Sequence, residues 1–214
     1  MSDWSDFDSQ MLAALLAREL TSGLPGRNAH RTMAPELAHG RHHGPFPTSV
    51  RRAAVLVVLE PAASGWSIPA TLRPETMKDH AGQVALPGGL IEPYETPPMT
   101  AVREFVEELG PSSADVEILG SLSPVFVFIT NFEVTPVLAV SHQPLVFRPN
   151  PMEVAEVVHI RVQDLLDPAR RGSHVLRRGA LAFRAPHFLL AGHQIWGATS
   201  LILAEFAELA VRIQ

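Results

Sequence analysis

Apolar residues recur along this chain at two spacings, and each spacing predicts a different element. Between residues 8 and 20 they fall three and four positions apart, which predicts a short amphipathic helix with Ser5 or Ser9 as its cap. The continuous run AAVLVVL at 53–59 is typical of a strand covered on both faces. A second apolar run at 66–72 follows after a short break, so the pair predicts a β-hairpin.

The second half of the chain alternates short strands with helical segments. The expected elements are strands at 116–122 and 132–140, a helical turn at 162–166, a hairpin formed by 181–183 and 188–190, and a final apolar helix through about Val211. Ala185 and Pro186 interrupt the expected hairpin. Strands in the middle of a chain with helices on either side predict an α/β protein in which a mixed sheet lies between helices, an α/β/α sandwich.

Residues 23–47 lack this regularity and are rich in Gly, Pro and His, which predicts a mobile linker. The histidines of the stretch 39–43, HGRHH, could instead bind a metal, although nothing in the sequence fixes their geometry. We therefore expect an N-terminal segment of helix and linker over 1–50 and one folded domain over 51–214.

Composition narrows the classes of function. The 214 residues are 46% hydrophobic, enough for one domain, and they contain no cysteine, which excludes disulfides, thiolate zinc sites and cysteine nucleophiles. The net charge of −5 gives no reason to expect nucleic-acid binding, although arginines at 170–171 and 177–178 predict a locally basic loop, a solvated turn or an anion-steering site. The acidic, polar start and the lack of about 18 consecutive apolar residues predict a cytoplasmic protein without a membrane span.

One helix combines an apolar face with a cluster of acids. Thr96 is placed to cap it, Pro97 suits its first position, and Gly110 followed by Pro111 ends it. The apolar face is expected to contain Met99, Val102, Phe105, Val106 and Leu109. The opposite face is expected to contain Glu104, Glu107 and Glu108.

These three carboxylates repel one another, each like-charge pair on an exposed helix costing about 0.2–0.5 kcal/mol. Arg103 lies one turn before Glu107 and offsets part of this repulsion. A hard divalent cation with oxygen ligands would offset more of it. The alternative is an acidic helix face that is simply solvated.

The flanks of this helix carry a recognisable signature. Gly89, Glu95 after five residues, and after seven more the run REFVEELG from Arg103 to Gly110 resemble the Nudix box of diphosphate hydrolases, with Pro111 as the departure. The resemblance implies a Nudix-type α/β/α sandwich and an enzyme in which Mg²⁺ or Mn²⁺ ions are held by the carbonyl of Gly89 and by Glu104, Glu107 and Glu108. It also implies that Arg103 orients Glu104 and that Glu95 braces the loop against the helix.

A second motif stands just upstream, over residues 73–89. It is similar to the motif that precedes the box in the coenzyme A pyrophosphatase branch of the family, and Pro74, Met77 and Leu86 depart from the usual residues. The matching positions are Thr71, Arg73, His80, Gly82, Pro87, Gly88 and Gly89. Read from the residues alone, Arg73, Lys78 and His80 offer donors to phosphates, and Gly82 permits close approach of the backbone. A histidine beside a turn is also commonly a structural hydrogen-bonding group.

A further carboxylate is expected before the late strand in the stretch 149–160. By resemblance Glu153 is the better candidate and Glu156 the alternative, and either could equally be a surface residue. Glu108 and Glu153 are both candidates for the general base. The N-terminal helix, together with the habits of the family, suggests a homodimer.

Three functions follow as expectations. The first is a metal-dependent hydrolase that splits coenzyme A or an acyl derivative into 3′,5′-ADP and a 4′-phosphopantetheine, using a small-molecule diphosphate and no nucleic-acid or membrane partner. The second is a relaxed hydrolase of ADP-ribose, NADH or nucleoside triphosphates. The third is a binding module of Nudix fold without catalysis, which is disfavoured because no carboxylate of the box is missing.

Overall fold

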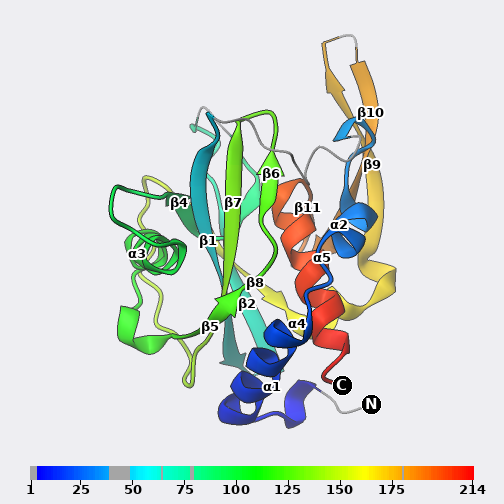
Figure 1. Cartoon of the computed structure of the whole chain (residues 1–214). Coiled ribbons are helices and arrows are strands. Elements are labelled where there is room, and N and C mark those ends of the chain that lie inside the picture. The colour runs from blue at the N-terminus through cyan, green and yellow to red at the C-terminus, as the bar shows by residue number, and fades with distance from the viewer. Residues whose placement is uncertain (1–3, 39–48, 64, 78–79, 180) are drawn as a thin grey trace.

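A computed structural model describes residues 4–38, 49–63, 65–77, 80–179 and 181–214. Its centre is a mixed sheet built on two long strands, β1 (Arg51–Ala62) and β7 (Phe132–Val140), which run parallel from the pair Arg51–Phe132 to the pair Leu59–Val140. Antiparallel strands extend the sheet on both sides of this pair, in the order β3-β2-β1-β7-β5 (Figure 1). The predicted mixed α/β class is confirmed.

The smaller strands complete this sheet. They are β2 (Gly65–Leu72), β3 (Val84–Ala85), β4 (Gly88–Leu90), β5 (Glu117–Ser121), β6 (Val125–Val127) and β8 (Glu156–Arg161). The predicted hairpin exists, since β1 and β2 pair antiparallel beside their shared turn. Over most of its length, however, β2 pairs with β8, and β1 pairs with β7 and β4.

The apolar run of β1 serves two cores because its side chains alternate between the faces of the sheet. Ala54, Leu56 and Val58 face one helix, α3 (Pro97–Leu109). Val57 and Leu59 face the larger core on the other side. Both faces of this strand are therefore covered, as the continuous apolar run predicted.

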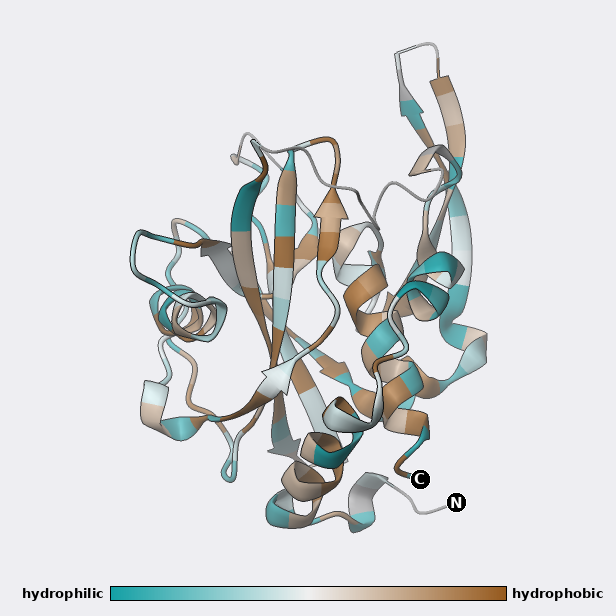
Figure 2. Cartoon of the chain, in the orientation of Figure 1, coloured by the Kyte–Doolittle hydropathy of each residue, from teal (hydrophilic) through white to brown (hydrophobic). Residues whose placement is uncertain are grey.

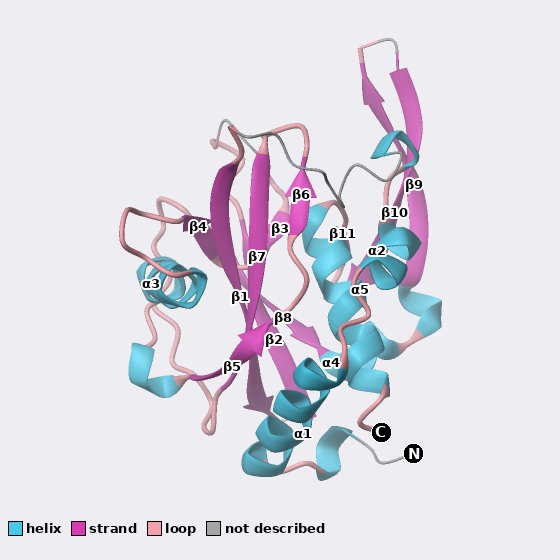
Figure 3. Ribbon diagram, viewed as in Figure 1, coloured by secondary structure: helices cyan, strands magenta, loops and turns pink. Residues whose placement is uncertain are grey.

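Helices cover the two faces of the sheet, as an α/β/α sandwich requires. The helix α3 lies on one face, and α1 (Ser9–Ser22), α2 (Arg27–Met33) and α5 (Ala198–Val211) lie on the other (Figures 1 and 3). Figure 2 shows that α5 is apolar on most of its surface, and ten of its residues are buried. The predicted turn at 162–166 is α4 (Val162–Leu166).

The N-terminal region is more ordered than its composition suggested. The cap of α1 is Asp8, whose Oδ1 accepts a hydrogen bond from the N–H of Met11 at 2.7 Å, and the expected cap Ser9 is the first helical residue. The predicted linker contains the helix α2, and Trp4 and Met33 belong to the larger core. The histidine stretch at 39–43 lies outside the described residues.

One buried carboxylate holds this region in place. Glu205 of α5 is fully buried and accepts hydrogen bonds from the N–H of Gly26 at 3.0 Å and from Ser123 Oγ at 2.6 Å. His30 Nε2 of α2 lies 3.0 Å from the second oxygen of Glu205. A buried carboxylate stays in an apolar core only when several donors satisfy it, so these contacts tie α2 to α5.

The region near residue 180 differs from the prediction. Residues 171–178 form a strand, β9 (Arg171–Arg178), in place of the expected basic loop. The two short runs are parts of one strand, β10 (Leu181–Leu190), which continues through Pro186 and pairs with β9 and with β11 (His193–Ile195). Cross-strand pairing overrides the local break, and β9 and β10 form an arm that projects from the body (Figure 1).

No helix in the described ranges is long and apolar enough to cross a membrane.

The buried face of α3 differs from the predicted one. Its buried residues are Thr100, Ala101, Phe105, Glu108 and Leu109, whereas Met99 is 55% exposed. At 3.6 residues per turn, Glu108 lies almost in line with Ala101 and about one sixth of a turn from Phe105. Placing Glu108 on the outer face was therefore wrong, because small Ala101 marks the centre of the inner face.

The anchoring of α3 can be tested with two substitutions on the same helix. Phe105→Ala should lower the free energy of unfolding by about 3–5 kcal/mol, since it removes a fully buried ring. Met99→Ala should change it by no more than about 0.5 kcal/mol. Urea denaturation followed by circular dichroism measures both, and equal effects would contradict the observed orientation of the helix.

Candidate active site

The loop before α3 is joined to the helix through one guanidinium group. Arg103 donates to both oxygens of Glu95, from Nε at 2.8 Å and from Nη2 at 3.1 Å. Its Nη1 donates to Glu104 at 2.8 Å and to Glu107 at 3.1 Å, and Nη2 also donates to the carbonyl of Leu90 at 3.2 Å. A guanidinium has five N–H groups, so Arg103 has no N–H left for a substrate and acts as a positioning residue.

Glu95 is the principal partner of this arginine. Its Oε2 also accepts hydrogen bonds from Thr100 Oγ1 at 2.7 Å and from the N–H of Glu92 at 3.1 Å. The hydrogen bonds from Arg103 and then from Thr100 lower the pKa of Glu95 to about 2, and the bond to Glu95 raises the pKa of Arg103. Glu95 therefore joins the loop to the first two turns of α3, the position from which a bracing role was predicted.

Glu104 lies against the glycine turn. Its carboxylate is so close to Gly89 that a Cβ at position 89 would collide with it. Burial raises the pKa of Glu104, and the hydrogen bond from Arg103 partly opposes this effect. The missing side chain at Gly89 thus forms a recess in which this carboxylate fits beside the backbone.

Glu108 is the most buried acid of the helix, with 5% of the residue exposed. Burial, and to a smaller extent the charges of Glu104 and Glu153, raise the pKa of Glu108 to about 8. The backbone N–H of Gly88, which hydrogen-bonds the carboxylate, and the charge of Arg73 act in the opposite direction. Such a group holds a proton near neutral pH until a positive charge comes close to it.

Glu153 reaches the same place from a distant part of the chain. The loop that carries Glu153 lies beside the C-terminal end of α3, where the N–H of Asn150 donates to the carbonyl of Glu108 at 2.8 Å. Asn150 Nδ2 then donates to Glu153 Oε1 at 3.1 Å. Glu153 acts electrostatically on both Glu104 and Glu108, whereas the alternative Glu156 pairs with Leu72 as the first residue of β8.

Arg73 is the predicted substrate-binding residue that the fold brings to these acids. It follows β2, where its backbone N–H donates to the carbonyl of Gln83 and its carbonyl accepts from the N–H of Gly82. Its Nε is buried and has no hydrogen-bond partner within the described part of the chain. A buried donor without a partner is costly, so this N–H is available to a group that could bind there.

The other described residues predicted to bind substrate, His80 and Gly82, make contacts of their own. His80 is exposed, with Nδ1 2.8 Å from Gln83 Oε1, and fits the structural alternative. Gly82 adopts a φ of 64°, and the space beside it is taken by the carboxylate of Glu75. Lys78 lies outside the described residues.

The sequence did not single out two contributors to this site. The N–H of Gly88 binds Glu108, and Asn150 holds Glu153 in position. The Asn-Pro pair at 150–151 was a usable signal, because asparagine before proline commonly opens a turn.

The acids gathered here suit a hard cation in chemistry. Carboxylate oxygens and a backbone carbonyl are the ligands that Mg²⁺ and Mn²⁺ take, and the recess at Gly89 brings the carboxylate of Glu104 close to the backbone. Glu104 and Glu108 also have raised pKa values that a cation would reverse. Within the described residues, no three acidic or histidine side chains surround one point in ligand geometry. Glu107, held outward by Arg103 and 57% exposed, would have to turn inward to join such a group.

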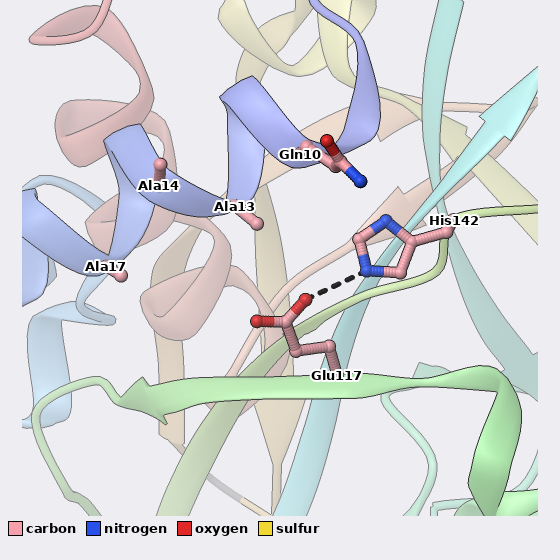
Figure 4. A pocket seen from close by; sticks show the side chains of 6 residues that line it. All are labelled: Gln10, Ala13, Ala14, Ala17, Glu117 and His142. Atoms are coloured by element: carbon pink, nitrogen blue, oxygen red, sulfur yellow. Dashed lines mark hydrogen bonds and ion pairs between the residues drawn. The ribbon is translucent and has the colours of Figure 1, made fainter.

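A cavity of about 330 Å³ lies elsewhere, between α1 and β5. Figure 4 shows Gln10 and three alanines of α1 along one wall, with His142 pointing toward Glu117 across it. His142 Nε2 lies 2.8 Å from Glu117 Oε2. None of the predicted site residues lines this cavity, and its rim is formed by groups that already bind one another.

The amino-acid sequence of this chain is similar to those of known proteins. The NUDIX domain matches residues 50–178. The human protein named mitochondrial coenzyme A diphosphatase NUDT8 is 37% identical over 164 residues, which cover 73% of this chain and 69% of that protein. The NudL Nudix hydrolase of Yersinia enterocolitica, described as uncharacterized, is 31% identical over 168 residues, covering 77% of this chain and 84% of that one.

A solved structure supports the fold. The Nudix hydrolase RenU from M. smegmatis superposes with a TM-score of 0.55 at 21% identity, covering 77% of this chain and 88% of that one. The mixed sheet between helices is therefore shared with known Nudix structures.

The two glycines of the turn offer a test of the recess. Gly89→Ala should change the free energy of unfolding by no more than about 1 kcal/mol, because the added Cβ meets only the movable end of Glu104. It should nevertheless lower kcat by about 10²-fold, because the carboxylate is displaced.

Gly88→Ala is the matched control. Its Cβ would meet the backbone of Ala54 and Val55, with Val55 Cα at 2.7 Å, so it should lower stability by about 1–3 kcal/mol. Thermal denaturation and turnover measured side by side separate the two effects, and a fully active Gly89→Ala enzyme would show that the recess is not needed.

The lowered pKa of Glu95 predicts a pH dependence of stability. The folded protein keeps this carboxyl ionised down to about pH 2, whereas in the unfolded chain its pKa is near 4.5. The stabilisation is therefore complete above pH 4.5 and is lost as the pH falls toward 2. Glu95→Gln should be less stable than the wild type at pH 7, and this difference should shrink between pH 4.5 and 2 in urea titrations. A difference that stays constant across that range would contradict the assignment.

Proposed function

This chain belongs to the Nudix family and is a Nudix pyrophosphohydrolase, and we propose a substrate and a cofactor for it. It splits coenzyme A or acyl-CoA into 3′,5′-ADP and a 4′-phosphopantetheine, with Mg²⁺ or Mn²⁺ as cofactor. The observation that carries the chemistry is that the charges of Glu104, Glu153 and Arg73 all act on the buried carboxyl group of Glu108, while the Nε of Arg73 is buried without a described partner. Acids that repel one another next to a phosphate donor suit a cation and a diphosphate together.

The choice of coenzyme A rests on two supports. The human relative named a coenzyme A diphosphatase is 37% identical over most of both chains. The motif before the glycine turn is similar to that of the coenzyme A branch, and the charge of its Arg73 lowers the pKa of Glu108. ADP-ribose, NADH and nucleoside triphosphates remain the alternative substrates within the same family.

The residues divide the work as follows. A bound divalent cation supplies an activated water and neutralises charge on the bridging oxygen. Glu104, Glu107, Glu108 and the carbonyl of Gly89 would hold it. Arg103 orients Glu104, Glu95 braces the loop, and the Nε–H of Arg73 binds a phosphate oxygen of the substrate.

Two carboxylates are candidates to take the proton from water. Burial raises the pKa of Glu108 to about 8, and a bound cation would lower this pKa and leave the carboxylate ionised, as a base requires. Glu153 is exposed and held by Asn150, where it could accept a proton from the solvent side. We assign the role of general base to Glu108, and Glu153 is the alternative.

Turnover of a substrate panel tests this function. With Mg²⁺, CoA should be split to 3′,5′-ADP and 4′-phosphopantetheine, both identified by mass spectrometry, faster than ADP-ribose, NADH or deoxynucleoside triphosphates are cleaved. EDTA should abolish the reaction, and added Mg²⁺ or Mn²⁺ should restore it. Turnover of ADP-ribose with CoA left intact would overturn the substrate assignment, and binding without any turnover would indicate a non-catalytic module.

Substitutions in the same assay separate the roles of the acids. Glu107→Gln and Glu108→Gln should each lower kcat by at least about 10²-fold. Neither should lower stability, since Glu107 is exposed and the charge of Glu108 is costly where it is buried. Glu153→Gln should have a clear effect and Glu156→Gln almost none. If Glu153→Gln were more damaging than Glu108→Gln, the proton would belong to Glu153.

A further inference from the structure

The arm formed by β9 and β10 ends in an open sheet edge. Its three strands lie in the order β11-β10-β9, and among the described strands β9 pairs with β10 alone. One side of β9 therefore presents backbone N–H and C=O groups with no strand partner in the described structure. Figure 1 shows the far end of the arm projecting beyond the body of the protein, while Phe188 at its base belongs to the larger core. An open edge of this kind is a template for another extended chain.

The arm is also basic in an acidic protein. Although the chain carries a net charge of −5, residues 168–204 contain no Asp or Glu. Arg171 and Arg177 of β9 and Arg184 of β10 are exposed, and none of the three forms an ion pair with a described residue. The carboxylate of Glu36 accepts a hydrogen bond from the backbone N–H of Arg184 at 2.8 Å, whereas no described acid pairs with Arg171 or Arg177.

The strand register places these arginines on one face. Arg171 and Arg177 share this face with Val175, because alternate residues of a strand point the same way. Arg184 lies opposite Val175 in the register and therefore diagonal to Arg177, at about 7–8 Å. Val175 is 60% exposed, and Arg171 is held over the ring of Phe188 at 5.4 Å. The face combines an apolar centre with cationic ends.

A second copy of this chain is disfavoured in the register that brings Arg171 of one copy to Arg177 of the other. In a symmetric antiparallel pair centred on His174, Arg171 of each copy would lie opposite Arg177 of the other. Like charges directly opposite one another destabilise a strand pair. The same two arginines would favour a strand with acidic residues at the positions opposite them.

We propose that the outer edge of β9 binds an extended acidic segment of a partner protein by strand addition. Its side chains would follow the order acid, apolar, polar, acid at alternate positions, opposite Arg177, Val175, Ser173 and Arg171. A polypeptide suits this edge better than a nucleic acid does, since only a polypeptide supplies the backbone N–H and C=O groups that pair with a strand. The exposed large apolar residues of the arm are aliphatic, Val175, Leu181 and Leu189, and offer no aromatic ring for a base to stack on.

Fluorescence anisotropy with a labelled peptide tests this directly. The probe contains the core Glu-Thr-Val-Thr-Ser-Thr-Glu, with flanking threonines, and the full-length protein should bind it saturably and more weakly as salt rises. The same peptide with alternate backbone amides N-methylated should bind at least about tenfold more weakly, because strand pairing needs those N–H groups. Equal binding of the N-methylated peptide, or tighter binding of a single-stranded oligonucleotide, would overturn the proposal.

Charge reversal on β9 provides a second, independent test. Arg171→Glu with Arg177→Glu should weaken binding of the acidic peptide at least about tenfold, and a peptide with lysines in place of its glutamates should restore it. The control Arg18→Glu with Arg52→Glu makes the same change of charge at exposed arginines outside the arm and should bind like the wild type. Should the first double variant fail to fold, Arg171→Gln with Arg177→Gln replaces it, and loss of binding is again expected. Unchanged binding in a folded arm variant, or no rescue by the lysine peptide, would refute the proposal.

Discussion

The five hydrogen bonds of Arg103 connect the glycine loop, the start of α3 and two acids of the helix. Bidentate contact with Glu95 fixes the plane of the guanidinium, and this plane in turn sets the direction of Glu104 and Glu107. Because the arginine is fully occupied, its task is geometric. The acids would otherwise spread apart by mutual repulsion, and the loop would lose its connection to the helix.

The sheet supplies what this contact cannot. Phe105 and Leu109 anchor α3 on β1 and β7, and β4 pairs with β1 to bring Gly88 and Gly89 beside the inner side of the helix. Glu108 is consequently buried under the turn, where its charge is costly and its pKa is raised to about 8. Rigid packing thus creates the electrostatic strain at the site, and a cation together with a diphosphate would relieve it.

The acidic cluster and the basic arm lie in different parts of the molecule. The carboxylates of α3 and Glu153 gather on one side of the sheet, whereas the arginines of β9 and β10 stand on an arm beyond the opposite helices (Figure 1). Glu205 links α5 to α2 and Ser123 inside the larger core. The N-terminal helices are therefore built into the same core as the sheet.

Local pattern in the sequence was sufficient for the helix at 97–109, the long strands and the family resemblance, because periodicity, caps and motif spacing are properties of neighbouring residues. The tertiary structure alone decided that Glu108 faces inward, and that the charges of Arg73 and of Glu153, some 45 residues after Glu108, act on it. It also decided that β10 continues through Pro186 and that the expected linker contains α2. These outcomes depend on which distant strands pair and which helices share a core, and contacts between distant residues leave no period in the chain.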